Sequence, residues 1–277
     1  MNHEWMLKFL QHRVADPRIL SLVRKWLKAG VSEDGEWSET KVGVPQGAVV
    51  SPLLANIYLH YVFDLWAQVW REKIATGDMI MVRYADDLVM GFEHRADAER
   101  FLNEFRERLA KFGLELHPDK TRLIEFGRYA IPNRQKRGEG KPETFPFLGF
   151  THCWARTFKS GAFTISRRTI GARLRAKLKQ IQQQLRRRMH DPVNMVGEWL
   201  HKVVTGYFLY HAVPGNTDSL NTFRHRLSRI WRQVLRRRSQ KYRLNWDDLR
   251  RHLDRWLPHP RVLHPYPSER FDATHPR

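Results

Sequence analysis

Hydrophobic residues recur at helical spacing in the first part of the chain. A period near 3.6 residues predicts amphipathic helices, with one face turned toward a core. Glycines after two of these segments predict where they end. A helix is expected over residues 2–12, a second from Pro17 to a stop at Gly30, a third from Ser51, and a fourth over 95–112 before Gly113. Their predicted apolar positions are Trp5, Phe9, Leu10; Leu20, Val23, Trp26, Leu27; Leu54, Ile57, Tyr58, Tyr61, Leu65, Val69; and Ala98, Phe101, Leu102, Phe105, Leu109, Phe112.

The third helix has its own start signals, because Ser51 suits the N-cap and Pro52 suits the first helical position. Between the helices, β-forming residues without a helical period predict strands. These are EWSETKVG after a turn at Asp34-Gly35, LELHPDKTRLIEF as two short strands, FPFLGF, and THCWARTFKSGAFTIS with a turn at Ser160-Gly161. The segment MIMVRYADDLVMGF is expected to form a hairpin with Ala85-Asp86-Asp87 at or near its turn, and 130–143 a polar loop.

The pattern changes near residue 166, where long amphipathic helices replace strands. Ile170, Leu174, Leu178, Ile181 and Leu185 form the stripe of the first. Further helices are expected over 193–211, over 218–239 with a cap at Thr217 or Asp218, and over 246–257. A proline-rich tail follows at 258–277. The fold class is therefore α+β, with an antiparallel sheet and packed helices over 1–165 and an all-α region over 166–257.

Charge is distributed very unevenly along the chain. The net charge is +20, and residues 151–277 carry 27 Lys and Arg against 8 Asp and Glu. So uneven a charge favours a polyanionic partner over a merely solvated surface. The single cysteine, Cys153, excludes an intrachain disulfide and a cysteine-based zinc site. The sequence shows neither a signal peptide nor an apolar run long enough to span a membrane, so we expect a cytoplasmic protein without a membrane partner.

The pair Asp86-Asp87 stands between apolar runs, and two explanations are open. Aspartates in turns often bond their own backbone and are merely solvated. Alternatively, carboxylates are the ligands that Mg²⁺ prefers, with substrate phosphates completing its shell. Neighbouring strand residues point to opposite faces, so we expect one of the two to be the direct ligand.

The order of motifs around this pair decides between them. RYADDLVM resembles the YxDD box of reverse transcriptases, and GVPQGAVVSPLLANIYLH upstream resembles the PQG block of group II intron reverse transcriptases. HPDKTRLIEF, FLGF and GYFLYHAV then resemble the later lysine block, the primer grip and the thumb, or maturase, domain. The resemblance implies a partial palm over 1–165, a thumb/maturase domain over 166–257, and an RNA-directed DNA polymerase that also assists intron splicing.

The resemblance also implies roles for individual residues. Asp86 is the expected metal ligand and Asp87 its supporting neighbour, in a two-metal Mg²⁺ site that binds dNTPs. Contacts to nucleotide or template are implied for Tyr84, Lys120, Gly43, Pro45, Gln46 and Gly47, and the primer grip for Phe147, Leu148 and Gly149. Backbone contacts to a primer–template duplex and to group II intron RNA are expected from Arg167, Arg168, Arg173, Arg175 and Lys177 flanking the first thumb helix, and from Arg186, Arg187, Arg188, Arg236, Arg237 and Arg238.

One departure from the family bears on activity. The first palm carboxylate of the family precedes a helix resembling NHEWMLKFL, which begins here at residue 2. That block and the finger segments are absent, so the two-metal site is incomplete and we expect little polymerisation by this chain alone. A non-catalytic RNA-binding, maturase-like protein is the alternative. A plain basic DNA-binding protein lacks any helix-turn-helix or zinc pattern to support it.

Overall fold

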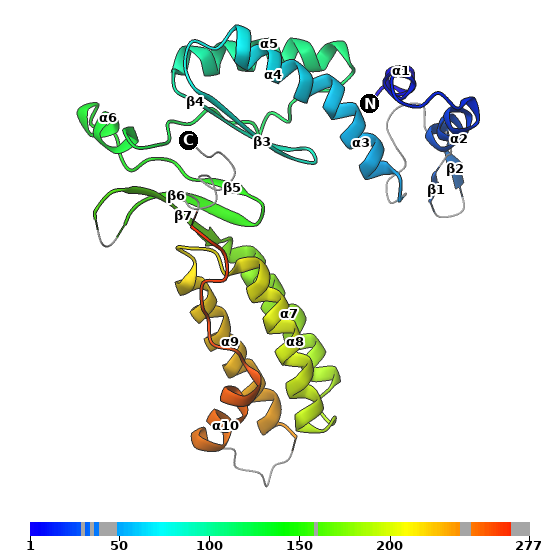
Figure 1. The fold of residues 1–277 in the computed structure, drawn as a ribbon. Coiled ribbons are helices and arrows are strands. Elements are labelled where there is room, and N and C mark those ends of the chain that lie inside the picture. Colours follow the sequence, from blue (N-terminus) through cyan, green and yellow to red (C-terminus); the bar gives the residue numbers. More distant parts are fainter. Residues whose placement is uncertain (29–30, 34–35, 39–48, 158–159, 239–244, 267–277) are drawn as a thin grey trace. The chain divides into compact units, whose positions relative to one another are not determined.

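The computed structural model describes all residues except 29–30, 34–35, 39–48, 158–159, 239–244 and 267–277 (Figure 1). The described residues form helices and small antiparallel sheets, which confirms the α+β class. They divide into two compact units, Met1–Ile124 and Glu125–Arg277.

Among the described residues, the first unit packs helices against one two-stranded antiparallel sheet and contains a second, shorter one. In chain order its elements are α1 (His3–Gln11), α2 (Pro17–Lys28), β1 (Val31–Glu33), β2 (Glu36–Ser38), α3 (Ser51–Leu59), the π-helical turn η1 (His60–Asp64), α4 (Leu65–Lys73), β3 (Met79–Tyr84), β4 (Asp87–Phe92) and α5 (Arg95–Lys111). Its core combines buried residues of α1, α2, the α3–α4 segment and α5 with the inner face of the β3–β4 hairpin.

The expected apolar stripe of the third helix is only half right. Leu54 and Tyr58 are buried, but Leu65 and Val69 are about half exposed. A π-turn adds a residue to one helical turn, so every later position moves round the helix. Past η1 the buried positions are therefore Ala67 and Trp70. The N-cap prediction was also wrong, because the helix begins at Ser51 itself and the cap position is Val50.

The other expectations for this unit mostly hold. Helices α1, α2 and α5 lie where they were predicted, although Trp26 on α2 is 42% exposed rather than buried. The hairpin of β3 and β4 is confirmed. The two strands expected in 114–126 are absent from these described residues, which form a turn and irregular chain. The β-forming residues of that segment find no strand partner, and a strand without a partner gains nothing from its propensity.

The second unit joins a three-stranded antiparallel sheet to a helical bundle. The sheet has the order β5 (Phe145–Phe147), β6 (Phe150–Arg156), β7 (Phe163–Thr169). A short helix, α6 (Ala130–Lys136), replaces part of the loop predicted at 130–143, so that prediction was wrong there. Arg167 and Arg168 lie on β7 and not on a helix, because the alternating segment FTISRRT pairs with β6 along its whole length.

In the part of the chain that the structure describes, four helices follow the sheet: α7 (Gly171–Arg187), α8 (Val193–His211), α9 (Thr217–Arg236) and α10 (Trp246–Trp256). The predicted stripe of α7 is buried at Leu174, Leu178, Ile181 and Leu185 and packs in one core with α8, α9 and α10. The cap of α9 is Asn216, not Thr217 or Asp218. The Asn216 side chain accepts from the Thr169 N–H at 2.9 Å and donates to the Thr169 hydroxyl at 2.8 Å, which ties β7 to the bundle.

These contacts explain where the unit boundary falls. The sheet and the bundle pack as one unit, so the boundary at 124–125 precedes the expected one at residue 165. The identities of the predicted palm and thumb domains stay predictions. Residues 258–266, the described part of the tail, are irregular, and Leu263 N–H donates to the Ala212 carbonyl at 2.9 Å. Within the described residues, no helix is long and apolar enough to cross a membrane.

Candidate functional site

The acidic pair lies at the exposed tip of the β3–β4 hairpin. Tyr84 pairs with Asp87, which leaves Ala85 and Asp86 as a two-residue loop. Asp86 and Asp87 are both exposed, and Tyr84 is 64% exposed. Ala85 has φ of +53°, a conformation that residues other than glycine and asparagine seldom adopt. The hairpin thus presents two carboxylates and one aromatic ring on a strained turn.

The alternation of the strands fixes which side chains share a face. Met79, Met81, Leu88, Met90 and Phe92 pack toward the core of the first unit. The opposite face of the hairpin carries Ile80, Val82 and Tyr84, all of them exposed. Residues paired across two strands point to the same side, so Asp87 shares this open face with Tyr84.

The chemistry of the tip fits a hard cation. Asp86 and Asp87 offer only oxygen donors, and neither forms an ion pair with any other described residue. Mg²⁺ is often held by one or two carboxylates together with substrate phosphates. Within the described residues, no cluster of three or more His, Cys, Asp or Glu exists that would hold a metal alone. Phosphates of a bound nucleotide have the oxygen chemistry to complete the shell of an ion at this tip.

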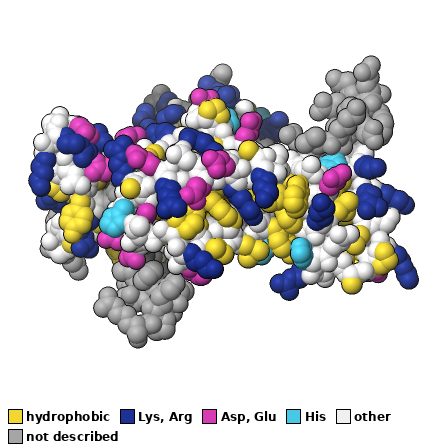
Figure 2. Space-filling view, turned by 90° about the horizontal axis from the view of Figure 1, so that it is seen from above, with side chains coloured by type: hydrophobic (Ala, Val, Ile, Leu, Met, Phe, Trp, Pro, Cys, Tyr) yellow, Lys and Arg dark blue, Asp and Glu magenta, His cyan; other side chains and the backbone are white. Residues whose placement is uncertain are grey.

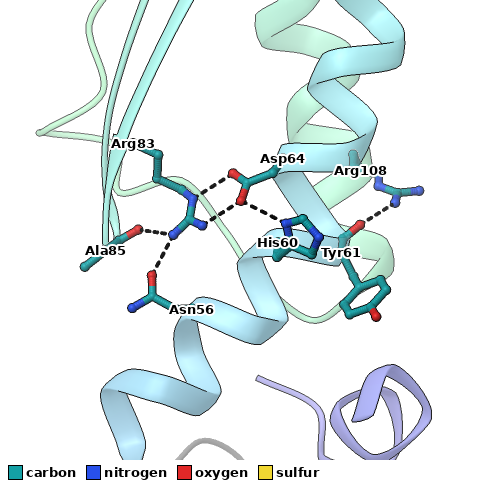
Figure 3. A network of polar contacts seen from close by, with 7 residues as sticks. All are labelled: Asn56, His60, Tyr61, Asp64, Arg83, Ala85 and Arg108. Carbon is teal, nitrogen blue, oxygen red and sulfur yellow. Dashed lines mark hydrogen bonds and ion pairs between the residues drawn. The ribbon is translucent and has the colours of Figure 1, made fainter. Parts of the chain in front are cut away.

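A polar network ties the hairpin to the helix beside it (Figure 3). The Arg83 guanidinium donates Nε to Asp64 Oδ1 at 2.7 Å and Nη2 to Asp64 Oδ2 at 2.6 Å. Its Nη1 donates to Asn56 Oδ1 at 2.7 Å and to the Ala85 carbonyl at 3.1 Å. His60 Nδ1 lies 3.3 Å from Asp64 Oδ2. Sequence reasoning missed this network, whose only signal was an arginine in an otherwise apolar strand.

A second arginine satisfies the π-turn that carries Asp64. Arg108 on α5 donates Nε to the Val62 carbonyl at 3.1 Å and Nη2 to the Tyr61 carbonyl at 3.2 Å (Figure 3 shows the latter). A π-turn breaks the regular i to i−4 pattern and leaves carbonyls in need of donors. The guanidinium also lies over the Phe112 ring, 4.6 Å from its centroid. Arg108 therefore holds the irregular turn in place.

The predicted primer-grip segment forms a second strained turn, in the other unit. Phe147 pairs with Phe150, so Leu148 and Gly149 make a two-residue loop with φ of +46° and +82°. Positive φ at both central residues is the pattern of a type I′ hairpin turn. The Leu148 carbonyl accepts from the Tyr210 hydroxyl at 2.8 Å, and the Gly149 carbonyl accepts from Ile170 N–H at 3.1 Å. Both carbonyls of the turn are thus held.

The remaining predicted nucleotide contacts are placed only in part. Lys120 is exposed in the turn that follows His117. Gly43, Pro45, Gln46 and Gly47 lie outside the described residues. The hairpin tip and the Leu148-Gly149 turn belong to different units, and each is described by itself.

All of the basic excess lies in the second unit. Residues 1–124 carry 17 Lys and Arg against 18 Asp and Glu, whereas residues 125–277 carry 32 against 11. Basic and acidic side chains are interspersed on the face drawn in Figure 2. The predicted backbone contacts lie on several elements: Arg168 on β7; Arg173, Arg175, Lys177, Arg186 and Arg187 on α7; and Arg188, Arg236, Arg237 and Arg238 at the ends of α7 and α9.

Two of these arginines meet a third that the sequence had not singled out. Arg168, Arg175 and Arg226 line an open hollow of about 260 Å³ between β7, α7 and α9. Arg173 lies instead beside the Leu148-Gly149 turn, where its Nη1 would be 3.1 Å from a Cβ added to Gly149. Arg188 stacks over Trp199 and faces Asp191 at 3.9 Å, so part of its charge is already paired.

Two partly buried histidines lie beside phenylalanine rings next to the Leu148-Gly149 turn: the ring centroid of His152 is 6.3 Å from that of Phe147, and that of His211 is 5.5 Å from that of Phe150. Burial, followed by the nearby Arg167 charge, lowers the pKa of His152, and burial is the main cause that lowers the pKa of His211. Burial also raises the pKa of Tyr207 to about 12. These groups are therefore uncharged at neutral pH and contribute aromatic packing rather than charge.

Comparison with known proteins agrees with the motifs. A family model described as reverse transcriptase (RNA-dependent DNA polymerase) matches residues 1–152. The chain is 31% identical to protein YkfC of Escherichia coli K12 over 175 residues, 50% of this chain and 45% of that protein.

Intron-encoded proteins are among the relatives. Identity is 43% over 133 residues to an uncharacterized 91 kDa protein in the cob intron of Schizosaccharomyces pombe, covering 46% of this chain and 16% of that one. The chain is also 40% identical over 60 residues to the group II intron-encoded protein LtrA of Lactococcus lactis, a match that covers 22% of this chain and 10% of that protein. The matched region spans less than half of each relative. The family model matches more than half of the residues of this chain, so the chain belongs to the reverse transcriptase (RNA-dependent DNA polymerase) family.

Proposed function

We propose that this chain acts in Mg²⁺-dependent nucleotidyl transfer, copying an RNA template into DNA in the manner of group II intron reverse transcriptases. The observation that carries the proposal is the hairpin tip, where Asp86 and Asp87 are exposed and form no ion pair among the described residues. Family membership and the intron-encoded relatives support the choice of reaction.

In this proposal each residue at the tip has a distinct task. Asp86 in the turn supplies the direct metal ligand, and Asp87 supports it from the first position of β4. Bound Mg²⁺ in this chemistry activates the primer 3′ oxygen and stabilises charge on the triphosphate. Tyr84, on the open face beside Asp87, offers a flat apolar surface on which the primer terminus rests.

The second unit would hold the nucleic acid. Its turn at Leu148-Gly149 presents backbone to a primer strand, and the hollow of Arg168, Arg175 and Arg226 offers guanidinium groups to phosphates. Phosphate contacts of this kind bind without reading sequence, and they weaken as salt rises. The excess of Lys and Arg in this unit is the observation that favours the second candidate function, intron RNA binding without catalysis.

Nucleotide binding separates the two candidates. The 277-residue protein is mixed with an RNA template annealed to a DNA primer, Mg²⁺ and labelled dNTP, and bound nucleotide is measured by equilibrium dialysis. Polymerase function predicts that template-directed dNTP binding needs Mg²⁺ and weakens at least about tenfold in Asp86→Asn, since a metal ligand is lost.

The opposite results are equally clear. If dNTP binding is indifferent to Asp86 while RNA is retained on filters with a steep salt dependence, the polymerase proposal fails and RNA binding stands. Asp86-dependent primer extension by this protein would refute the sequence-based expectation of little polymerisation.

A further inference from the structure

We propose that Arg83 and Asp64 are positioning residues that fix the hairpin tip, and with it Asp86, relative to the α3–α4 segment. The role deepens the proposed nucleotidyl transfer and rests on it. Asp64 lies outside the motifs that pointed to the site, and Arg83, the first residue of RYADDLVM, was given no role there. The network they form joins two parts of the chain 19 residues apart (Figure 3).

The ion pair has the geometry of a fixed contact. Two parallel N–H donors of Arg83 meet the two oxygens of Asp64 at 2.7 and 2.6 Å. The side chains are 17% and 31% exposed, so water screens them only in part. Bidentate arginine–carboxylate pairs of this kind fix direction as well as distance. Isolated exposed pairs seldom do either.

The guanidinium then acts directly on the turn. Its Nη1 donates to the Ala85 carbonyl at 3.1 Å, and the same nitrogen is anchored by Asn56 Oδ1 at 2.7 Å. Ala85 has φ of +53°, which costs an L-residue free energy and persists only where neighbours hold it. Asp86 follows Ala85 directly. The direction of the Asp86 side chain is therefore set by the residue whose carbonyl Arg83 holds.

Asp64 has a second effect on the site, through charge. Arg83 lies only three residues before Asp86, and a free guanidinium there would attract the carboxylates of the tip. The bidentate contact with Asp64 holds the positively charged guanidinium against the α3–α4 segment. Asp86 and Asp87 stay available for a cation. A π-turn places Asp64, and such turns are often found at functional sites.

The first experiment measures positioning without catalysis. Amide hydrogen exchange of the hairpin, residues 79–92, is followed by mass spectrometry in the unmodified protein, Arg83→Gln and Asp64→Asn. Each variant is expected to exchange at the tip about tenfold faster, as loss of a charged hydrogen bond shifts a local opening equilibrium. The double variant Arg95→Gln/Glu99→Gln, which removes an exposed pair on α5, is the control and leaves the hairpin unchanged.

The second experiment measures the consequence for the site. In the dialysis assay with Mg²⁺ and primer–template, Arg83→Gln and Asp64→Asn weaken dNTP binding about tenfold while RNA retention stays unchanged. Arg83→Lys, which keeps the charge but not the fork, recovers part of the loss. The combined Arg83→Gln/Asp64→Asn variant loses no more than the worse single variant, because both act through one contact.

The outcomes keep the two proposals apart. If amide exchange of the hairpin is the same in both single variants as in the control, the positioning role is overturned, regardless of the result for dNTP binding. Faster exchange with dNTP binding unchanged, in a protein whose binding does need Asp86, also overturns it. If the two variants exchange faster but dNTP binding does not depend on Asp86, the Arg83–Asp64 pair still fixes the hairpin, and the polymerase function is refuted instead.

Discussion

Replacing Arg108 by methionine tests whether one side chain stabilises η1, the π-turn that carries Asp64. Methionine keeps helix propensity and most of the apolar stem, but it removes both donors to the Tyr61 and Val62 carbonyls. Hydrogen bonds that involve a charged group contribute about 1.5–3 kcal/mol each, and loss of the cation–π contact with Phe112 adds about 0.5–1 kcal/mol. Water will reach part of the vacated site, so we expect a net loss of about 2–4 kcal/mol.

Hydrogen exchange gives this free energy for the first unit alone. A change of about 1.4 kcal/mol is tenfold in an opening equilibrium, so exchange of α3–α4 and α5 amides should accelerate by about 30-fold or more. The matched control is Arg106→Met on the same helix, where an exposed side chain makes a single bond to Asn103 at 3.2 Å. That change is expected to stay within about 0.5 kcal/mol.

The refuting result is equal exchange in the two variants. It would mean that water satisfies the carbonyls of the π-turn as well as Arg108 does. The π-turn would then be stabilised by the local sequence alone, and the contacts of Arg108 on α5 would not be needed to position Asp64.

Two further predictions concern the second unit. Gly149→Ala should destabilise it by about 1 kcal/mol, because φ of +82° disfavours a Cβ and the less flexible unfolded chain offsets only part of that cost; denaturant unfolding measures it. Gly140→Ala, with no neighbour within 4 Å of the added Cβ, is the control. His152 and His211 have lowered pKa values, so the unfolded chain binds more protons below about pH 6.5 and the stability of the folded unit should fall as pH decreases through that value.

The results that would contradict these two predictions are specific. Equal unfolding midpoints for Gly149→Ala and Gly140→Ala would mean that the turn relaxes freely. For the histidines, thermal melting is followed between pH 7.5 and about pH 5. A melting temperature that is flat in this window, or that keeps its slope when both histidines are replaced by glutamine, would contradict the assignment.

Much of the hairpin tip could be predicted from sequence, for a physical reason. Six residues on each side of the turn alternate between a core face and an open face. A period of two on both sides of a turn is typical of a hairpin and of few other structures. The turn at Leu148-Gly149 was not predicted, because FPFLGF was expected as a strand, whereas β5 ends at Phe147 and β6 begins at Phe150. The β3–β4 hairpin is local, so a short window of sequence contains the interactions that form it.

The parts that sequence reasoning missed depend on distant partners. The buried face changes at η1 because Arg108, 46 residues beyond Val62, satisfies the carbonyls that the π-turn releases. Arg83 and Asp64 read as a strand residue and a helix residue until the fold brings them to 2.6 Å. Arg167 and Arg168 were placed with the first helix of the all-α region because the pattern was taken to change near residue 166, whereas pairing with β6 puts both on β7.

The central claim is that Asp86 holds a divalent metal together with a nucleotide. Mn²⁺ replaces Mg²⁺ at oxygen ligands and is visible by electron paramagnetic resonance. With primer–template and dNTP present, we predict that the protein binds Mn²⁺ in a state distinct from free Mn²⁺–dNTP, that Asp86→Asn abolishes this signal, and that Asp119→Asn, an exposed turn aspartate of the same unit, preserves it. An identical signal in all three proteins, or none in the unmodified protein, would contradict the claim.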